Sequence, residues 1–209
     1  ANLQSKFKRF SREPLASGLT GREVAEKMLH DNGIYNVTVI STPGQLTDHY
    51  NPTNQTVNLS EGVFNSTSVA AAAVAAHECG HAVQHATAYG PLRLRSALVP
   101  VVSMASQVVS WILLAGILLV QTFPALLLFG IGLFAMTTLF SVITLPVEID
   151  ASRRATVWLQ RAGITSNREQ PMAVSALRSA AYTYVVAALS SLATLIYYVL
   201  IFMGSQRDE

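Results

Sequence analysis

Residues 70–86 read AAAAVAAHECGHAVQHA, a run of alanine that leads into two histidines and a glutamate. Alanine has the highest intrinsic helix propensity, so this stretch is expected to be helical. On a helix, His77 and His81 project from the same face, one turn apart. The two imidazoles can therefore hold one metal ion, with Glu78 beside that face.

The pattern His-Glu-x-x-His combines two metal ligands with a carboxylate that can act as a base. Zinc held by two histidines lowers the pKa of a water molecule toward neutrality and polarises a carbonyl group. Glu78 would take a proton from that water and pass it to a leaving amine. The helical context and Gly80, which permits close approach of a neighbouring element, favour this interpretation over two buried structural histidines.

A catalytic zinc site has three protein ligands and an open position, so a third ligand must come from elsewhere. The remaining histidines are His30, His49 and His85, and the other candidates are acidic residues of the polar segments. His85 lies two turns from His77, too far along the helix axis for a compact site. Glu148 in LPVEIDASRRA is the preferred ligand because it directly follows an apolar segment; a solvated helix start is the alternative.

Much of the second half of the chain is apolar. Only 12% of the 209 residues are charged, about half the fraction in a typical soluble domain. No charged residue occurs between Arg95 and Glu148 or after Arg178 until Arg207. Because about 20 helical residues cross a bilayer, we expect three transmembrane helices, at 98–120, 124–146 and 182–203. A large soluble bundle is the alternative, but it would have too little polar surface to cover such helices.

The positions of the basic residues predict the orientation in the membrane. Of the 14 Lys and Arg residues, all but Arg207 lie in segments 1–96 and 147–178. Basic residues concentrate on the cytoplasmic side of a membrane. We therefore expect a multi-pass protein of the cell membrane, with these two segments cytoplasmic and the loop at 121–124 on the opposite side. The single cysteine, Cys79, fits a reducing compartment.

The expected fold class is a mainly α membrane protein with a small antiparallel β element. The predicted parts are a catalytic domain in two pieces, 1–96 and 147–181, a transmembrane hairpin at 97–146, a transmembrane helix at 182–203 and a tail at 204–209.

Capping and turn residues predict the elements of the first piece. A helix over 21–33 has Thr20 as its N-cap and ends at Gly33. Strands rich in β-branched residues follow at 37–41, 46–50 and 55–59. The helix that carries HECGH is expected to begin at Ser66, Thr67 or Ser68 and to run to Tyr89, where Gly90-Pro91 end it.

Five stretches of the chain resemble the YugP-like membrane zinc metallopeptidases: LTDHYNP, VNLSEGV, AAHECGHAVQ, LPVEIDASRRA and AAYTYVVAAL. More distantly, the chain is similar to HtpX-type membrane proteases, in which a glutamate in an E-x-x-A-D pattern follows two membrane spans. The resemblance implies a minimal zincin-like domain of gluzincin type. In it His77, His81 and Glu148 would bind one zinc ion per chain, and Glu78 would be the base.

The chain departs from the wider pattern at Ser152, where that group has aspartate. Either Asp150 orients a histidine in its place, or that support is weaker here. Members of the family usually begin with a membrane helix. A chain that begins at Ala1 is compatible with the removal of such a segment, which would give the full protein four spans.

The resemblance also suggests that LTDHY is the edge strand above the site, where a substrate peptide could pair. His49 or Tyr50 could stabilise the oxyanion, but adjacent strand residues point to opposite faces, so both cannot. We favour His49, with Tyr184 and Arg178 as further candidates.

The expected function is an integral-membrane zinc endopeptidase that acts on peptides or membrane proteins at the cytoplasmic surface of the lipid bilayer. No nucleic-acid partner is predicted, and an oligomer or a regulatory partner is compatible with this function. An intramembrane zinc protease would take its third ligand from an aspartate inside a later span, and no span here contains one. A non-catalytic scaffold or assembly factor with a structural zinc site is the third possibility, although the intact Glu78 favours an enzyme.

Overall fold

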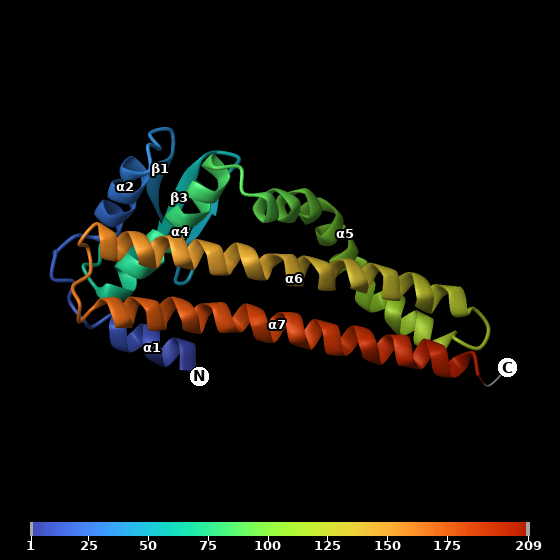
Figure 1. The fold of residues 1–209 in the computed structure, drawn as a ribbon. Helices are drawn as coiled ribbons and strands as arrows, with labels where there is room; N and C mark the ends of the chain where they lie inside the picture. The colour runs from blue at the N-terminus through green and yellow to red at the C-terminus, as the bar shows by residue number, and fades with distance from the viewer. Residues whose placement is uncertain (1, 208–209) are drawn as a thin grey trace. The chain divides into compact units, whose positions relative to one another are not determined.

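The computed structural model describes residues 2–207 of the chain (Figure 1). Its helices are α1 (Asn2–Phe10), α2 (Gly21–Asp31), α3 (Glu61–Phe64), α4 (Val69–Ala86), α5 (Gly90–Leu118), α6 (Pro124–Arg161) and α7 (Gln170–Ser205). Its strands are β1 (Thr38–Thr42), β2 (His49–Asn51) and β3 (Thr56–Ser60).

The chain folds into two compact units. The first, called here the polar unit, contains the residues up to Tyr89 together with Val147–Tyr182. The second, called the apolar unit, contains Gly90–Pro146 and the residues from Thr183 onward. Each unit has its own hydrophobic cluster.

Helix α2 begins at the residue that its sequence predicts and ends at Asp31, two residues before the predicted end at Gly33. The hydroxyl of Thr20 accepts the Glu23 backbone N–H at 3.2 Å, and the Glu23 carboxylate accepts the Thr20 backbone N–H at 2.9 Å. This reciprocal capping box satisfies two donors that a helix start otherwise leaves unpaired. Gly33 has a φ of +71° just beyond the helix end, a conformation that glycine adopts without strain.

The sheet has the strand order β1-β3-β2 and is mixed, which differs from the antiparallel sheet expected from the sequence. Strands β2 and β3 are antiparallel, whereas β1 and β3 are parallel. Six residues, 43–48, separate β1 from β2. This connection carries the chain past one strand position, and β3 then fills the gap. The turn signal at Pro43-Gly44 indicates a change of direction but not which strands become neighbours.

Helix α4 is capped by Ser68, one of the three predicted caps, whose hydroxyl accepts the Ala71 backbone N–H at 3.1 Å. The helix ends at Ala86, before the predicted end at Tyr89, because Ala88 adopts a φ of +53°. Gly90 and Pro91 open α5 rather than only ending α4, which is compatible with the preference of proline for a first helical turn.

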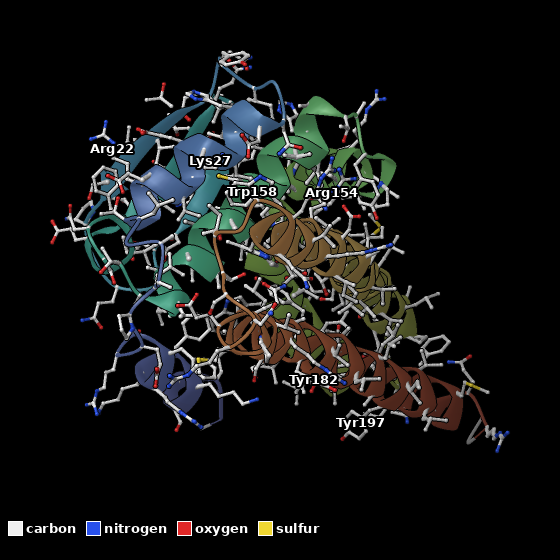
Figure 2. All side chains as sticks on the ribbon, turned by 60° about the vertical axis from the view of Figure 1, so that its left-hand side comes forward. Arg22, Lys27, Arg154, Trp158, Tyr182 and Tyr197 are labelled. Carbon is white, nitrogen blue, oxygen red and sulfur yellow. The ribbon has the colours of Figure 1, made fainter. Side chains whose placement is uncertain are left out.

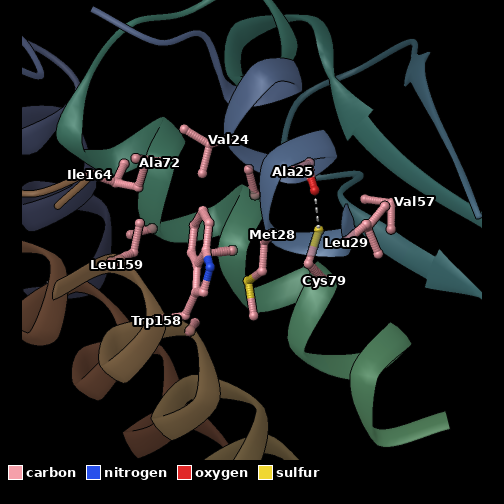
Figure 3. Close-up of a cluster of buried hydrophobic side chains, with 14 of the residues drawn as sticks. Val24, Ala25, Met28, Leu29, Val57, Ala72, Cys79, Trp158, Leu159 and Ile164 are labelled. Carbon is pink, nitrogen blue, oxygen red and sulfur yellow. Dashed lines mark hydrogen bonds between the residues drawn. The ribbon is translucent and has the colours of Figure 1, made fainter. Parts of the chain in front are cut away.

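Small side chains let α4 lie in the middle of the polar unit's core (Figure 3). The core residues labelled there are Val24, Ala25, Met28 and Leu29 of α2, Val57 of β3, Ala72 and Cys79 of α4, Trp158 and Leu159 of α6, and Ile164. The Cys79 thiol donates to the Ala25 carbonyl at 3.5 Å. Burial raises the pKa of Cys79 well above its ordinary value, so it behaves as a packed apolar group rather than a reactive thiol.

Helix α6 also packs against α2. The indole N–H of Trp158 donates to the Asp31 carboxylate at 2.9 Å, which places this ring beside the C-terminal end of α2 (Figure 2). The N-terminal helix α1, which was not predicted from the sequence, lies against the start of α7. Phe7 and Phe10 of α1 pack with Ala70 and Ala176 in a small separate cluster.

Helices α5, α6 and α7 are each long and apolar enough to cross a membrane, as the sequence predicts. Their bounds differ from the predicted spans. Helix α5 begins earlier, at Gly90, and ends at Leu118, whereas α6 continues through Pro146 and α7 begins at Gln170. Apolar composition marks where a bilayer would end and does not mark where helical hydrogen bonding ends. Within the apolar unit, Trp111 is 74% exposed, which suits a surface that faces lipid.

Glycine sets the separation of α4 and α6. A Cβ at Gly80 would lie 2.6 Å from the Ala151 carbonyl oxygen of α6, closer than any real side chain approaches backbone. The two helices therefore touch backbone to backbone at this point, the close approach that a glycine at position 80 permits.

Gly80→Ala is expected to force α4 and α6 apart and to destabilise the protein by about 1–3 kcal/mol, the cost of overpacking. The measurement is the thermal unfolding midpoint in detergent micelles. Gly62→Ala is the matched control, because Gly62 is also helical and has open space around it. That control should be neutral or stabilising by up to ~1 kcal/mol. Equal midpoints for the two variants would contradict the close contact.

Candidate metal centre

Three potential metal ligands converge in the polar unit. His77 and His81 come from α4, and Glu148 comes from the part of α6 that follows Pro146. One ligand atom from each residue lies within 4.8 Å of the others. The i, i+4 spacing places the two imidazoles in contact, with ring centroids 4.8 Å apart and planes at 85°.

The distances from Glu148 to the two imidazoles are close to those between ligands of a tetrahedral zinc ion. The Oε2 atom of Glu148 lies 3.1 Å from Nε2 of His77 and 3.6 Å from Nε2 of His81. Zinc bonds to nitrogen and oxygen of roughly 2.0–2.1 Å place neighbouring tetrahedral ligands about 3.3–3.4 Å apart. The two observed distances lie on either side of that value, so the Glu148 oxygen is placed to share one ion with each imidazole.

The cluster is largely shielded from solvent. Glu148 is 3% exposed and His81 is 8% exposed, whereas His77 is half-buried. Burial lowers the pKa of His81, but the nearby carboxylate of Glu148 and the charge of Glu78 more than offset this, so the pKa is raised. The site therefore attracts positive charge, and a buried carboxylate of this kind needs a cationic partner.

The second nitrogen of each imidazole has a partner of its own. Nδ1 of His77 lies 3.0 Å from the Ser152 hydroxyl, and Nδ1 of His81 lies 3.0 Å from the Gln84 side-chain oxygen. Ser152 thus occupies a supporting position next to His77. Asp150 contacts Gln84 at 2.8 Å rather than a histidine.

Sequence reasoning missed Gln84 as a neighbour of the cluster. A signal was present, because Gln84 lies three residues after His81 and would share its face of the helix. The sequence does not indicate that Gln84 is fully buried, at 0% exposure, because the next residue, His85, is polar as well.

Glu78, the predicted base, is half-buried on α4 next to His77. Among residues 2–207, no hydrogen bond or ion pair to its carboxylate is found, so this group remains available to accept a proton. Its negative charge acts on His81, which places it near the cluster.

The other predicted candidates lie outside the three-residue cluster. His49 is exposed at the start of β2, with Nδ1 2.7 Å from the Thr47 carbonyl. Tyr50 turns to the other side of the strand, where its hydroxyl lies 2.9 Å from Nδ1 of His85. His30 stacks on a tyrosine ring at 5.2 Å.

The two further oxyanion candidates lie on α7. Arg178 contacts the hydroxyl of Tyr182 at 3.4 Å, and Tyr184 lies two residues further along the helix in the apolar unit. Tyr182 and Tyr197 are both exposed along this helix (Figure 2).

The convergence of these ligands agrees with comparisons to known proteins. Residues 1–203 match a family described as "putative neutral zinc metallopeptidase". The chain belongs to this family. It is also 44% identical over 209 residues to the "Putative membrane protease YugP" of Bacillus subtilis, an alignment that covers 99% of this chain and 91% of that protein. No solved structure matches the chain.

The ligand set suits the metal named in the family description. Two imidazole nitrogens and one carboxylate oxygen form a set that catalytic zinc sites use, with the fourth position left for water or substrate. His77, His81 and Glu148 would hold the ion in this member of the zinc metallopeptidase family.

Glu148→Gln is expected to weaken zinc binding by more than the ~10–100-fold that is typical when a hydrogen-bond partner of a metal ligand is lost. The reason is that this substitution removes the negative charge of a ligand that binds the ion directly. Competition against a chromophoric chelator measures this affinity. Glu169→Gln is the matched control, a buried carboxylate in the same unit that accepts only backbone N–H groups of Ala16 and Ser166. Unaltered zinc affinity in Glu148→Gln would refute the assignment of Glu148.

Proposed function

We propose that the chain is an integral-membrane zinc endopeptidase that hydrolyses peptide bonds. The observation that carries the proposal is the convergence of His77, His81 and Glu148 at distances suited to one zinc ion, with Glu78 adjacent. Membership of the zinc metallopeptidase family supports the same reaction.

The chemistry divides between the ion and the side chains. Bound zinc would lower the pKa of a water molecule and polarise the scissile carbonyl. Glu78 would accept the proton of the attacking water and deliver it to the leaving amine. Its half-buried position and its carboxylate, which has no partner among residues 2–207, support this role.

The substrate peptide is proposed to pair with strand β2. The strand order β1-β3-β2 leaves β2 at an edge of the sheet, where one side of its backbone can receive another strand. His49 lies on this strand and would donate to the oxyanion. Its exposed side chain would have to leave the Thr47 carbonyl to do so.

The active site is proposed to lie on the cytoplasmic side of a multi-pass membrane protein. Three helices that suit membrane crossing and the concentration of basic residues in the polar segments support this orientation. Glu148 lies on α6 only two residues after Pro146, where the apolar part of that helix ends. Peptides near the bilayer and membrane proteins are therefore the proposed substrates.

Glu78→Gln is expected to lower kcat for peptide hydrolysis by about a hundred- to ten-thousand-fold, the contribution of a positioned base. Zinc content should be unchanged, because Glu78 is not a ligand in this proposal. The assay uses the zinc-loaded full chain in micelles, a fluorogenic peptide library and metal analysis of the same samples.

Glu26→Gln is the control for this assay. Glu26 is an exposed residue of α2 that pairs with Arg22 at 2.8 Å, and its loss should leave hydrolysis unaltered. A Glu78→Gln protein that hydrolyses peptide at the rate of the Glu26→Gln control would refute the protease proposal. In the same assay, an unaltered kcat for His49→Ala would remove His49 from the mechanism.

Cysteine labelling should test the orientation. The single native cysteine, Cys79, is fully buried, so the unmodified chain should give a low background. Gln121→Cys, between α5 and α6, should react with a membrane-impermeant maleimide on intact cells. Asn54→Cys, in the polar unit, should react only after permeabilisation. The reverse pattern would contradict a cytoplasmic active site.

A further inference from the structure

The Gln84 amide is held in one orientation by two acceptors on α6. Its Nε2 lies 2.8 Å from the Val147 carbonyl oxygen and 2.8 Å from a carboxylate oxygen of Asp150. A backbone carbonyl and a carboxylate can only accept, so both amide hydrogens are donated to them. The side-chain oxygen of Gln84 must therefore face the other way, toward His81.

This orientation fixes the role of each nitrogen in the His81 ring. The Gln84 oxygen, 3.0 Å from Nδ1 of His81, can only accept, so Nδ1 carries a hydrogen and donates it. The remaining lone pair of a neutral imidazole is then on Nε2. Nε2 is the atom that lies 3.6 Å from Glu148 within the ligand cluster.

Asp150 is itself held in place by a neighbouring cation. Nε of Arg154, one turn further along α6, donates to the same Asp150 oxygen at 2.6 Å. The Arg154 guanidinium carbon also lies over the ring of Tyr89, 5.6 Å from the ring centroid. The charge of Asp150 is thereby balanced, and its oxygen stays available to the Gln84 amide.

We propose that Gln84 is a positioning residue that selects Nε2 of His81 as a metal ligand and ties it to the helix that supplies Glu148. The proposal rests on the proposed zinc site but not on peptide hydrolysis. Val147 and Asp150 flank Glu148 on α6. The Gln84 amide, which bonds to both of them and to His81, therefore fixes the position of His81 relative to Glu148. A buried amide with all three bonds made is rigid, which suits this role.

The test separates the acceptor of Gln84 from its donors. Gln84→Met keeps the side-chain length but can neither accept from His81 nor donate to α6. Gln84→Glu keeps an acceptor for His81 and loses the donors. Each full-length variant is compared with wild type for zinc affinity, by chelator competition, and for thermal midpoint. Glu169→Gln again serves as the control for loss of a buried polar group away from the cluster.

Gln84→Met is expected to bind zinc ~10–100-fold more weakly, the usual effect of losing a hydrogen-bond partner of a metal ligand. Gln84→Glu should lose thermal stability yet bind zinc more tightly than Gln84→Met, and Glu169→Gln should lose stability with zinc affinity retained. Zinc affinity in Gln84→Met within twofold of wild type, or equal weakening in both Gln84 variants, would overturn the proposal.

A measurement on the unmodified protein covers the case in which Gln84→Met does not fold. In zinc-loaded chain carrying ¹⁵N-histidine, the His81 ring should show a protonated Nδ1 and a metal-bound Nε2. The opposite assignment would overturn the proposal. A protein that shows the expected signals but no hydrolysis would refute the protease function and leave the role of Gln84 intact.

Discussion

The backbone contact between α4 and α6 is the constraint on which the site depends. Gly80 lies between the two histidines, and the carbonyl of Ala151 fills the space that a side chain there would need. This contact brings residues on either side of Ala151 into reach of α4. Glu148 and Ser152 both reach His77, and Asp150 reaches Gln84, because all of them lie within one turn of that contact.

Burial holds the side chains of this polar cluster in one arrangement, because each buried polar atom needs a hydrogen-bond partner. Among the buried side chains of residues 2–207, every nitrogen and oxygen atom has a hydrogen-bond partner. Leaving such an atom without a partner costs about 1–3 kcal/mol. The imidazoles, the Gln84 amide and the carboxylates therefore hold one another in position before any ion is added, so that less ordering is needed when a metal binds.

Local signals were sufficient to predict much of the fold. The caps Thr20 and Ser68, the three apolar helices and the shared face of His77 and His81 each follow from residues that are close in sequence. The parallel pairing of β1 with β3 and the burial of Gln84 depend on contacts between distant segments. Glu148 was preferred among several possible ligands because it directly follows an apolar segment, and the family resemblance strengthened that choice, since nothing local links it to α4.

The serine beside His77 affects the charge of the centre as well as its geometry. A hydroxyl orients the imidazole without adding charge, whereas the aspartate of the wider pattern would add a negative one. Asp150 does not compensate, because Arg154 neutralises it. With zinc bound by two neutral imidazoles and one carboxylate, we expect a net charge of about +1 on the ligand set. That excess positive charge would act on whatever occupies the open position, and it favours an electron-rich oxygen there.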